Sequence, residues 1–309
     1  MSLLLLSHRS CLLHDPGDYH PECPDRLRAV LKALEAEEFA HIVRDEAPEA
    51  THEQLCRVHP RNYVDAILAI RPEPGESVPL DGDTVMGPGS AEAALRAAGA
   101  AVAGVDAVMR GEFRRAFCAT RPPGHHAEPT RPMGFCFFAN AVVAARHAQA
   151  AHGAAKVAII DFDVHHGNGT QACVEGDGSI LSASSHQWPL YPGTGDRRER
   201  GVGNIFNATL PGGADGAAFR EAWAGALLPA IEFFAPDLLV ISAGFDAHAR
   251  DPLAQLRVRE ADFAWLTAEL CRIAERHCRG RIVSLLEGGY DLDALASSAA
   301  AHVRVLMQG

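Results

Sequence analysis

Short apolar runs alternate along the chain with longer segments in which apolar residues recur every three or four positions. The short runs have the length of buried β-strands, and the longer segments have the spacing of helices that bury one face. Six runs are predicted as strands: residues 3–6, 116–119, 157–162, 180–183, 238–242 and 282–286. Four segments are predicted as helices: residues 91–109, 140–152, 217–234 and 262–278. This alternation predicts an α/β fold with a mainly parallel central sheet flanked by helices on both faces.

Local signals mark helix ends and one long loop. Asp262 is predicted to cap the N-terminus of the fourth helix, and Pro236 follows the third helix as a stop signal. Residues 71–90 are rich in proline and glycine and are predicted as a loop, and loops of this length often carry function in compact domains. No linker or repeat divides the 309 residues, so we expect a single domain over residues 1–309.

The charge balance narrows the classes of partner. Acidic residues outnumber basic ones by 39 to 28, and the net charge is −11. General binding to nucleic acid or to an anionic membrane usually needs a basic patch, so neither partner is expected. No stretch approaches the roughly 18 consecutive apolar residues of a membrane span. The charge is compatible with a basic protein or a polyamine as substrate.

The cysteines and the first ten residues bear on cellular location. The eight cysteines are scattered and include no Cys-x-x-Cys pair. The opening MSLLLLSHRS has no basic residue before its apolar run, so we interpret it as a first strand rather than a secretory signal. Together these features predict a reduced, cytoplasmic protein without a disulfide framework.

Four polar clusters stand where predicted strands end. RPPGHHAEPT follows the strand at 116–119, and DFDVHHGNGT ends the strand at 157–162. SAGFDAH follows the strand at 238–242, and LEGGYDL ends the strand at 282–286. In open parallel sheets, ligands bind in the crevice at the carboxyl ends of the strands. We therefore expect the four clusters to form one site.

The second of these clusters has the donor types of a metal site. Alternate side chains of an extended segment share a face, so Asp161, Asp163 and His165 point the same way. A catalytic Zn²⁺ takes about three protein ligands and keeps one position open. Asp163 and His165 supply two ligands, and Asp246 at another strand end is the natural third. The alternative is that Asp163 and His165 only bind loop backbone, but the three other polar strand ends favour a metal.

Two adjacent histidines and a tyrosine add acid–base groups. His125 and His126 lie in a turn held by two prolines and a glycine, and an imidazole titrates near neutral pH. They suit proton transfer, with metal binding as the alternative. Tyr290 follows two glycines, and its phenol is able to donate a hydrogen bond to a developing oxyanion. The alternative for Tyr290 is an ordinary surface tyrosine.

The motifs together resemble the histone deacetylase superfamily. They are RPPGHHA, GFCFFAN, DFDVHHGNGT, YPGTG, SAGFDAH, DPL and EGGY, in this order. The nearest resemblance is to the class II branch and its bacterial deacetylase-like amidohydrolases, and HPECPDRL at 20–27 is similar to the N-terminal motif of the family. The resemblance covers residues 20 to about 290 and implies an arginase/deacetylase-like fold.

The resemblance implies a set of metal ligands. Asp163, His165 and Asp246 match the family's zinc ligands, and Fe²⁺ is an alternative in cells. Asp161, Asp163, His165 and Ser184 match the positions where relatives hold a structural K⁺. The implied reaction is hydrolysis of an N-acyl amine by metal-activated water, with release of acetate.

The resemblance also implies catalytic roles. His126 matches the general base that takes a proton from the water and passes it to the leaving amine. His125 matches its electrostatic neighbour, oriented by Asp161, and Tyr290 matches the phenol that polarises the acetamide carbonyl. Asn168 stands where some relatives carry an aspartate as the partner of the second histidine. An amide holds His126 without raising its basicity as a carboxylate would, and it is typical of class II.

The implied substrate is an acetylated lysine side chain of a protein or peptide. Phe135 and Tyr191 match the aromatic pair that walls a narrow tunnel, and Asp83 is a loose match to a residue that grips substrate backbone. Leu253 occupies the position where polyamine-selective relatives place a glutamate, which counts against a polyamine specialist. The second candidate is a small-molecule amidohydrolase, such as an acetylpolyamine deacetylase acting on a small N-acyl amine.

Two further alternatives are less favoured. A two-manganese ureohydrolase of the arginase-like fold needs a second Asp-x-Asp, and the chain has Asp246-Ala-His248 instead. A non-catalytic acyl-lysine reader is expected to have lost a ligand, the acid–base histidine or the tyrosine, and all are present. The sequence carries no signal of oligomeric state.

Overall fold

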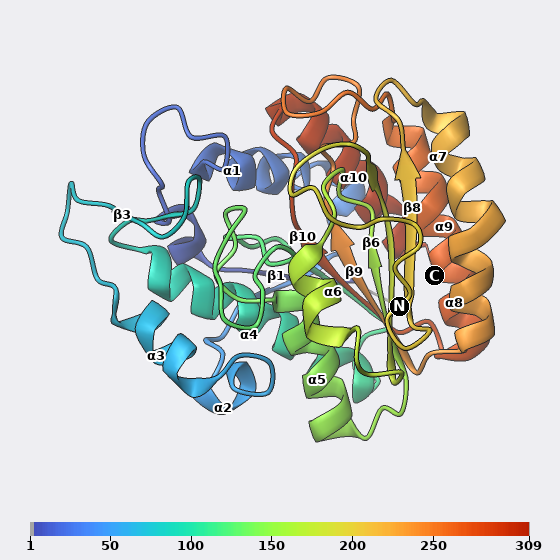
Figure 1. The fold of residues 1–309 in the computed structure, drawn as a ribbon, viewed down its shortest axis with the longest axis horizontal. Coiled ribbons are helices and arrows are strands. Elements are labelled where there is room, and N and C mark those ends of the chain that lie inside the picture. Colours follow the sequence, from blue (N-terminus) through green and yellow to red (C-terminus); the bar gives the residue numbers. More distant parts are fainter. Residues whose placement is uncertain (1–2, 309) are drawn as a thin grey trace.

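Eight parallel strands form the central sheet of the protein. The computed structural model describes residues 3–308. All neighbouring strands of this sheet pair in parallel. Their order is β2 (Val43–Glu46), β1 (Leu4–Ser7), β5 (Arg115–Cys118), β10 (Ile282–Leu286), β9 (Leu238–Ala243), β6 (Val157–Asp161), β7 (Ile180–Gln187) and β8 (Ile205–Leu210). The predicted α/β fold with a parallel central sheet is confirmed (Figure 1).

Alternate residues of the strands contribute to two separate cores. In β6, Ala158 and Ile160 belong to the core on one face of the sheet, while Val157 and Ile159 belong to the core on the other. Both faces are therefore buried, and all five residues of β6 are inaccessible to solvent. A strand buried on both faces is apolar without interruption, which is why the sequence pattern reveals it as a continuous run.

Helices cover both faces of the sheet. The first core contains residues of α1 (Pro24–Ala33), α7 (Gly216–Ala222), α8 (Leu228–Phe234), α9 (Glu260–His277) and α10 (Leu292–Met307). The second core contains residues of α4 (Ser90–Met109) and α5 (Asn140–His152). Figure 1 shows α7, α8 and α9 on one side of the sheet and α4 and α5 on the other. The sheet is thus the middle of three layers.

The structure corrects two details of the predicted helices. The segment 217–234 forms α7, a π-helical turn (Trp223–Leu227) and α8 in succession. Helix α8 ends at Phe234, and its C-cap Ala235 precedes Pro236. The prediction of Asp262 as an N-cap is wrong, because α9 begins at Glu260 and Arg259 is the N-cap. Asp262 lies in the first turn, where its carboxylate accepts a hydrogen bond from the Arg259 N–H at 2.9 Å. Asp262 therefore provides an acceptor for a backbone N–H at the start of α9, although it lies inside the helix.

The apolar pattern does not reveal several shorter or more polar elements. Besides α1, α10, β2 and β8, these are η1 (Arg9–Leu12), η2 (Glu37–Phe39), α2 (His52–Leu55), α3 (Arg61–Ala69) and α6 (Asn168–Val174). The predicted loop at 71–90 contains a small antiparallel hairpin of β3 (Val78–Pro79) and β4 (Val85–Met86). This hairpin brings residues 81–84 toward the carboxyl edge of the sheet, where they contribute to the site described below.

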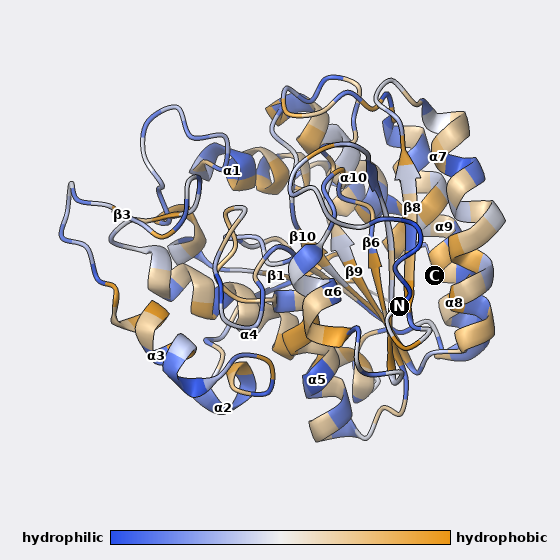
Figure 2. Ribbon diagram, viewed as in Figure 1, coloured by the Kyte–Doolittle hydropathy of each residue, from blue (hydrophilic) through white to orange (hydrophobic). Residues whose placement is uncertain are grey.

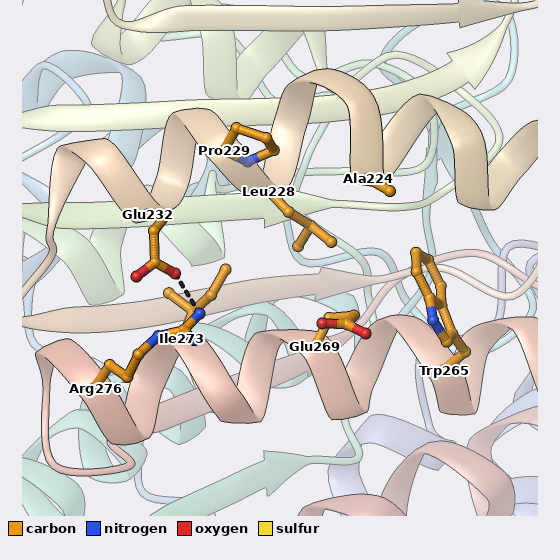
Figure 3. Close-up of a pocket in the computed structure, with 8 residues that line it drawn as sticks. All are labelled: Ala224, Leu228, Pro229, Glu232, Trp265, Glu269, Ile273 and Arg276. Carbon is orange, nitrogen blue, oxygen red and sulfur yellow. Dashed lines mark hydrogen bonds and ion pairs between the residues drawn. The ribbon is translucent and has the colours of Figure 1, made fainter.

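The outer helices are amphipathic. Figure 2 shows hydrophobic residues along β6 and β9, and alternating hydrophilic and hydrophobic residues along α7 and α8. A groove of about 600 Å³ lies between α8 and α9, where Leu228 and Trp265 contribute apolar surface (Figure 3). Glu232 and Arg276 form an ion pair of 2.5 Å across it. Within residues 3–308, no helix combines the length and apolar character needed to cross a membrane.

Candidate active site

The four polar clusters predicted from the sequence follow four neighbouring strands. Strands β5, β10, β9 and β6 are adjacent in the sheet, in that order. Because these strands are parallel, their carboxyl ends lie at one edge, and the segments that follow them meet there. Contacts among the four clusters show that the structure brings them together, as the sequence predicts.

Asp163, His165 and Asp246 form a compact, buried cluster. The Nδ1 atom of His165 lies 3.1 Å from Oδ1 of Asp163 and 3.0 Å from Oδ2 of Asp246. Ligand atoms from all three side chains lie within 4.8 Å of one another. Backbone N–H groups orient both carboxylates: Val164 donates to Asp246 at 2.8 Å, and Gly288 donates to Asp163 at 2.8 Å. The structure therefore brings together the three residues predicted as ligands.

The cluster is suited to a cation. Burial lowers the pKa of His165, but hydrogen bonds and charges of Asp163 and Asp246 outweigh it and raise this pKa to about 10. The two carboxylates thus favour positive charge at this point. Two carboxylate oxygens and one imidazole nitrogen are a donor set that Zn²⁺ and Fe²⁺ accept. His248, two residues after Asp246, contacts Glu260 at 3.4 Å instead and is not part of the cluster.

Glycines let the backbone approach the carboxylates closely. A Cβ atom at Gly288 would lie 2.2 Å from Oδ2 of Asp246 and 2.5 Å from Oδ2 of Asp163. A Cβ atom at Gly244 would lie 2.1 Å from Oδ2 of Asp163. Neither position has room for a side chain, so the glycines of SAGFD and EGGY follow from the packing of the cluster.

His125 and His126 lie beside the cluster, and their pKa values are shifted in opposite directions. The Nδ1 atom of His125 lies 3.0 Å from Oδ2 of Asp161, as expected for a histidine oriented by that carboxylate. Burial lowers the pKa of His125, but the charges of Asp163 and Asp161 reverse this and hold it well above the usual value. Burial and the positive charges of His125 and His165 hold the pKa of His126 well below the usual value. The two adjacent imidazoles thus have pKa values shifted in opposite directions, an arrangement that suits different parts in acid–base chemistry.

The partner of His126 fixes its tautomer. Asn168 donates from Nδ2 to Oε1 of Glu128 at 2.8 Å, so its Oδ1 atom faces His126. That oxygen accepts a hydrogen bond from Nδ1 of His126 at 2.8 Å. The Nε2 atom of neutral His126 is then free to accept a proton, and His126 lines the pocket. The predicted contact between His126 and Asn168 is present, whereas the part of Glu128 was not predicted.

Glu287 supports the histidine loop and was not predicted. One oxygen of this buried carboxylate accepts hydrogen bonds from the N–H groups of Gly124 and His125, at 2.7 and 3.2 Å. The other accepts a hydrogen bond from the Ser242 hydroxyl at 3.1 Å. Burial raises the pKa of Glu287 to about 7. The sequence signal that could have indicated Glu287 was its position in the LEGGY motif, which also contains Tyr290.

A buried arginine supports the tyrosine. Arg26 donates from Nε to the carbonyl of Gly289 at 2.6 Å, and its guanidinium lies 4.8 Å from the centre of the Tyr290 ring. Glu22 pairs with Arg26 at 3.0 Å, and it also pairs with Arg121, whose NH2 lies 2.6 Å from Oε2. All three charged residues are fully buried. The motif at 20–27 was noted from the sequence without a role, and the structure shows it as the support of the Tyr290 turn.

The remaining predicted residues surround one narrow pocket. Its volume is about 250 Å³, and its lining includes Asp83, His126, Gly134, Phe135, His165, Leu190, Tyr191, Leu253 and Tyr290. Tyr191 and Leu253 are 39% and 37% exposed, so they lie at the mouth. Only His165 of the predicted metal ligands lines the pocket, while the two aspartates are buried behind it. The structure therefore places the predicted tunnel residues next to the predicted catalytic ones.

Phe135 is held in an unusual backbone conformation. Its φ angle is 69°, in the left-handed region that a bulky residue seldom adopts. The Thr84 hydroxyl accepts a hydrogen bond from the Phe135 N–H at 3.0 Å, and the ring of His20 contacts the Phe135 ring edge-on at 4.8 Å. His20 also binds the carbonyl of Asp83 at 3.0 Å. The hairpin and the N-terminal motif together hold this wall of the pocket.

The four residues predicted around K⁺ lie at the end of β6, in the loop that follows it, and in the adjacent strand β7. Asp161 and Ser184 are register partners in β6 and β7. The Asp163 N–H donates to Oδ1 of Asp161 at 3.1 Å, and Ser184 Oγ lies 2.9 Å from Nδ1 of His186. A Cβ atom at Gly167 would lie 2.4 Å from Oδ2 of Asp161, so this side of Asp161 is also closely packed.

Comparisons with known proteins agree with this geometry. The family model described as the histone deacetylase domain matches residues 20–306. The chain belongs to the histone deacetylase family. The resemblance inferred from the motifs is thereby confirmed, and this family membership supports a hydrolase of the deacetylase type.

This histone deacetylase family member is similar to proteins from plants and bacteria. It is 39% identical over 324 residues to histone deacetylase 14, chloroplastic, of Arabidopsis thaliana, covering 98% of this chain and 76% of that protein. It is 43% identical over 277 residues to a histone deacetylase-like amidohydrolase of Pseudomonas aeruginosa, covering 88% and 72%. The crystal structure of the HDA15 HD domain superposes with a TM-score of 0.92 at 37% identity, covering 99% of this chain and 88% of that one.

Proposed function

We propose that this protein is a metal-dependent deacetylase that hydrolyses the amide of N-acetyl-lysine and releases acetate. One observation carries the proposal. A buried Asp163–His165–Asp246 cluster, an imidazole with a free nitrogen on His126 and the phenol of Tyr290 all lie at one narrow pocket. Amide hydrolysis requires a polarised carbonyl, an activated water and a proton for the leaving amine, and these groups correspond to the three needs.

Asp163, His165 and Asp246 would hold the metal, with Zn²⁺ as the first candidate and Fe²⁺ as the second. When bound, such an ion supplies Lewis acidity toward the acyl oxygen and makes water a stronger nucleophile at neutral pH. A structural K⁺ held by Asp161, Asp163, His165 and Ser184 is part of the proposal. It would balance the carboxylates that face the cluster.

His126 moves the proton in this mechanism. Its pKa is low, so the imidazole is neutral and Nε2 accepts a proton from the attacking water. Asn168 keeps the Nδ1 proton in place throughout. The proton on Nε2 then passes to the amine nitrogen as the carbon–nitrogen bond breaks. His125, whose pKa the charges of Asp163 and Asp161 hold well above its usual value, stabilises the negative charge that develops nearby.

Tyr290 stabilises the acyl oxygen as it gains negative charge. Burial, first of all, holds the pKa of this phenol well above its usual value, so the hydroxyl keeps its proton and donates it in a hydrogen bond. Loss of one such donor typically slows turnover by about 10²- to 10³-fold. Arg26 orients the phenol through the Gly289 carbonyl and the ring face, and is therefore a positioning residue.

The pocket favours a long, thin acyl-amine side chain. Phe135 and Tyr191 offer aromatic surface to the methylenes of lysine, and Leu253 adds an apolar contact at the mouth. A small N-acyl amine, such as an acetylpolyamine, is the second candidate. The carboxylate of Asp83 supports it, because an acidic group in the pocket lining attracts a second amino group.

Acetate release from an acetyl-lysine peptide and from N-acetylputrescine, measured side by side with zinc-loaded protein, tests the proposal. We expect faster release from the peptide. Faster release from N-acetylputrescine would support the same mechanism with a small N-acyl amine as the substrate. No release from either substrate by protein with zinc bound would contradict the deacetylase proposal.

A further inference from the structure

A second cluster of metal-ligating side chains lies between α4 and α5. Asp106, near the end of α4, faces His147 and His152 of α5. Both imidazoles present Nε2 to the same oxygen, because His147 lies 2.8 Å and His152 lies 2.6 Å from Oδ1 of Asp106. The three ligand atoms lie within 4.8 Å of one another, as those of the Asp163 cluster do. No other such group of three occurs among residues 3–308.

The cluster lies at the opposite edge of the sheet from the active site. His152 ends α5 and precedes the first residue of β6, Val157, whereas Asp163 follows the last residue of that strand, Asp161. An ion bound here is therefore separate from the ion proposed for catalysis. None of these three residues contributes to the catalytic pocket.

We propose that Asp106, His147 and His152 bind a transition-metal dication, with Zn²⁺ as the probe. Two imidazole nitrogens are borderline donors that suit Zn²⁺, Ni²⁺ or Cu²⁺, and a single carboxylate oxygen is too few hard donors for Mg²⁺ or Ca²⁺, which prefer all-oxygen sites. The side chains are 7%, 15% and 27% exposed for His147, His152 and Asp106. The cluster is thus preformed but open on one side, so an ion enters from solvent and water completes its coordination.

Without an ion, the side chains of this cluster are joined by hydrogen bonds. Arg57 donates to Nδ1 of His147 at 2.8 Å, so Nδ1 is an acceptor and the N–H of this ring is on Nε2, pointing at Asp106. Metal binding at Nε2 moves that proton to Nδ1, and Arg57 must then release the ring. Glu53 already binds the other nitrogen of the guanidinium at 2.9 Å and retains Arg57 when it turns away. Arg57 therefore competes with the ion, and its removal should tighten binding.

Zinc content after equilibrium dialysis gives the first test. We compare wild type with His152→Gln, and Asp163→Asn with the double variant Asp163→Asn/His152→Gln. In both backgrounds, His152→Gln should remove one zinc per chain. The matched control is His41→Gln, an exposed histidine outside both clusters, which should remove none. The difference within each pair does not depend on whether the catalytic cluster binds metal, so failure of the proposed function and failure of this site are distinguishable.

Arg57→Ala gives the second test. It should tighten zinc binding at this site by about tenfold, because the ion no longer has to displace the hydrogen bond from Arg57 to His147, and one such bond to a charged group is worth about 1.5 kcal/mol. Zinc should also raise the Tm of Asp163→Asn protein and leave the Tm of the double variant unchanged, because the ion joins α4 to α5. Unchanged zinc content in both His152→Gln proteins, or a loss equal to that of His41→Gln, would overturn the proposal.

Discussion

Asp251 accepts a hydrogen bond from the backbone N–H of Tyr290, with 2.8 Å between Oδ2 and the nitrogen. Its other oxygen accepts a hydrogen bond from the N–H of Leu253 at 3.0 Å. One buried carboxylate therefore joins the turn that carries the phenol to the residue at the pocket mouth. Burial raises the pKa of Asp251 to about 6, so the carboxylate is ionised at neutral pH and accepts from both donors.

Asp251→Asn should impair turnover without removing metal. The amide keeps the size of the side chain but offers only one acceptor atom, so either Tyr290 or Leu253 loses its hydrogen bond. We expect kcat for an acetyl-lysine peptide to fall about tenfold, the equivalent of one lost hydrogen bond to a charged group. Steady-state kinetics and zinc content measure the effect. A change in KM alone would show that Asp251 acts on substrate binding and not on Tyr290.

Gly288→Ala should weaken metal binding while the fold persists. The added methyl group would meet Oδ2 of Asp246 and Oδ2 of Asp163 and push both carboxylates from their positions. We expect zinc affinity at the catalytic cluster to fall by at least about tenfold. Gly176→Ala is the matched control, because a Cβ atom there meets nothing within 4 Å. Equal zinc affinity in the two variants, measured by competition with a chelator, would show that the cluster tolerates displacement.

Asp163→Ala, His165→Ala and Asp246→Ala should each lose catalytic metal and activity together. Each substitution removes one of three donor side chains that converge within 4.8 Å, and two donors bind zinc weakly. Zinc content and acetate release, measured on the same preparations, check the link. A variant with full activity and one zinc fewer than wild type would place the catalytic metal elsewhere.

His59 should make the stability of the fold depend on pH. Its Nδ1 atom donates to the Pro129 carbonyl at 3.0 Å, and its Nε2 atom accepts from the Ala139 N–H at 3.0 Å. Burial lowers the pKa of His59 to about 4, so the folded protein holds it neutral. As pH falls from 6.5 toward 4, the unfolded chain binds a proton that the folded protein does not. The free energy of unfolding should therefore fall by about 3 kcal/mol over this window from His59 alone.

The variant His59→Gln cannot titrate, so it should lack this part of the pH slope. Urea unfolding at several pH values between 7.5 and 4 measures the slope in both proteins, and the slopes are compared because the substitution itself lowers stability. His41→Gln is the exposed control and should keep the wild-type slope. Equal slopes in wild type and His59→Gln would mean that the pKa of His59 does not differ between the folded and unfolded protein, which would contradict the prediction.

The buried elements of the fold were predictable from the sequence, and the solvated ones were not. Strand β6 is buried on both faces, so its apolar run is continuous. All four residues of β2 are exposed at the edge of the sheet. Three of them are charged, so no apolar run marks the strand in the sequence. Strand β7 extends to Gln187, whereas the prediction ended it at residue 183 because the residues that follow are polar. Those polar residues are buried in the structure, and hydrogen bonds such as that between Ser184 and His186 satisfy them.

The candidate site was predictable only where its chemistry lies beside a strand end. The Asp163 cluster and the histidine pair follow strands and stand in dense polar motifs. The contact between Arg26 and Gly289 spans 263 residues, and the contact between Glu287 and Gly124 spans 163. Which residues meet over such separations depends on how the sheet and helices pack, and no local sequence pattern indicates it. Asp262 shows the same limit on a small scale, since a capping box and an N-cap aspartate look alike in sequence.

The hydroxyl of Tyr290 is central to the proposed mechanism. The decisive measurement is acetate release from an acetyl-lysine peptide by zinc-loaded Tyr290→Phe protein beside wild type, with zinc content determined for both. Phenylalanine keeps the ring beneath Arg26 and removes only the hydroxyl. We predict equal zinc content and a fall in kcat of about 10²- to 10³-fold. Turnover equal to that of wild type would contradict the mechanism.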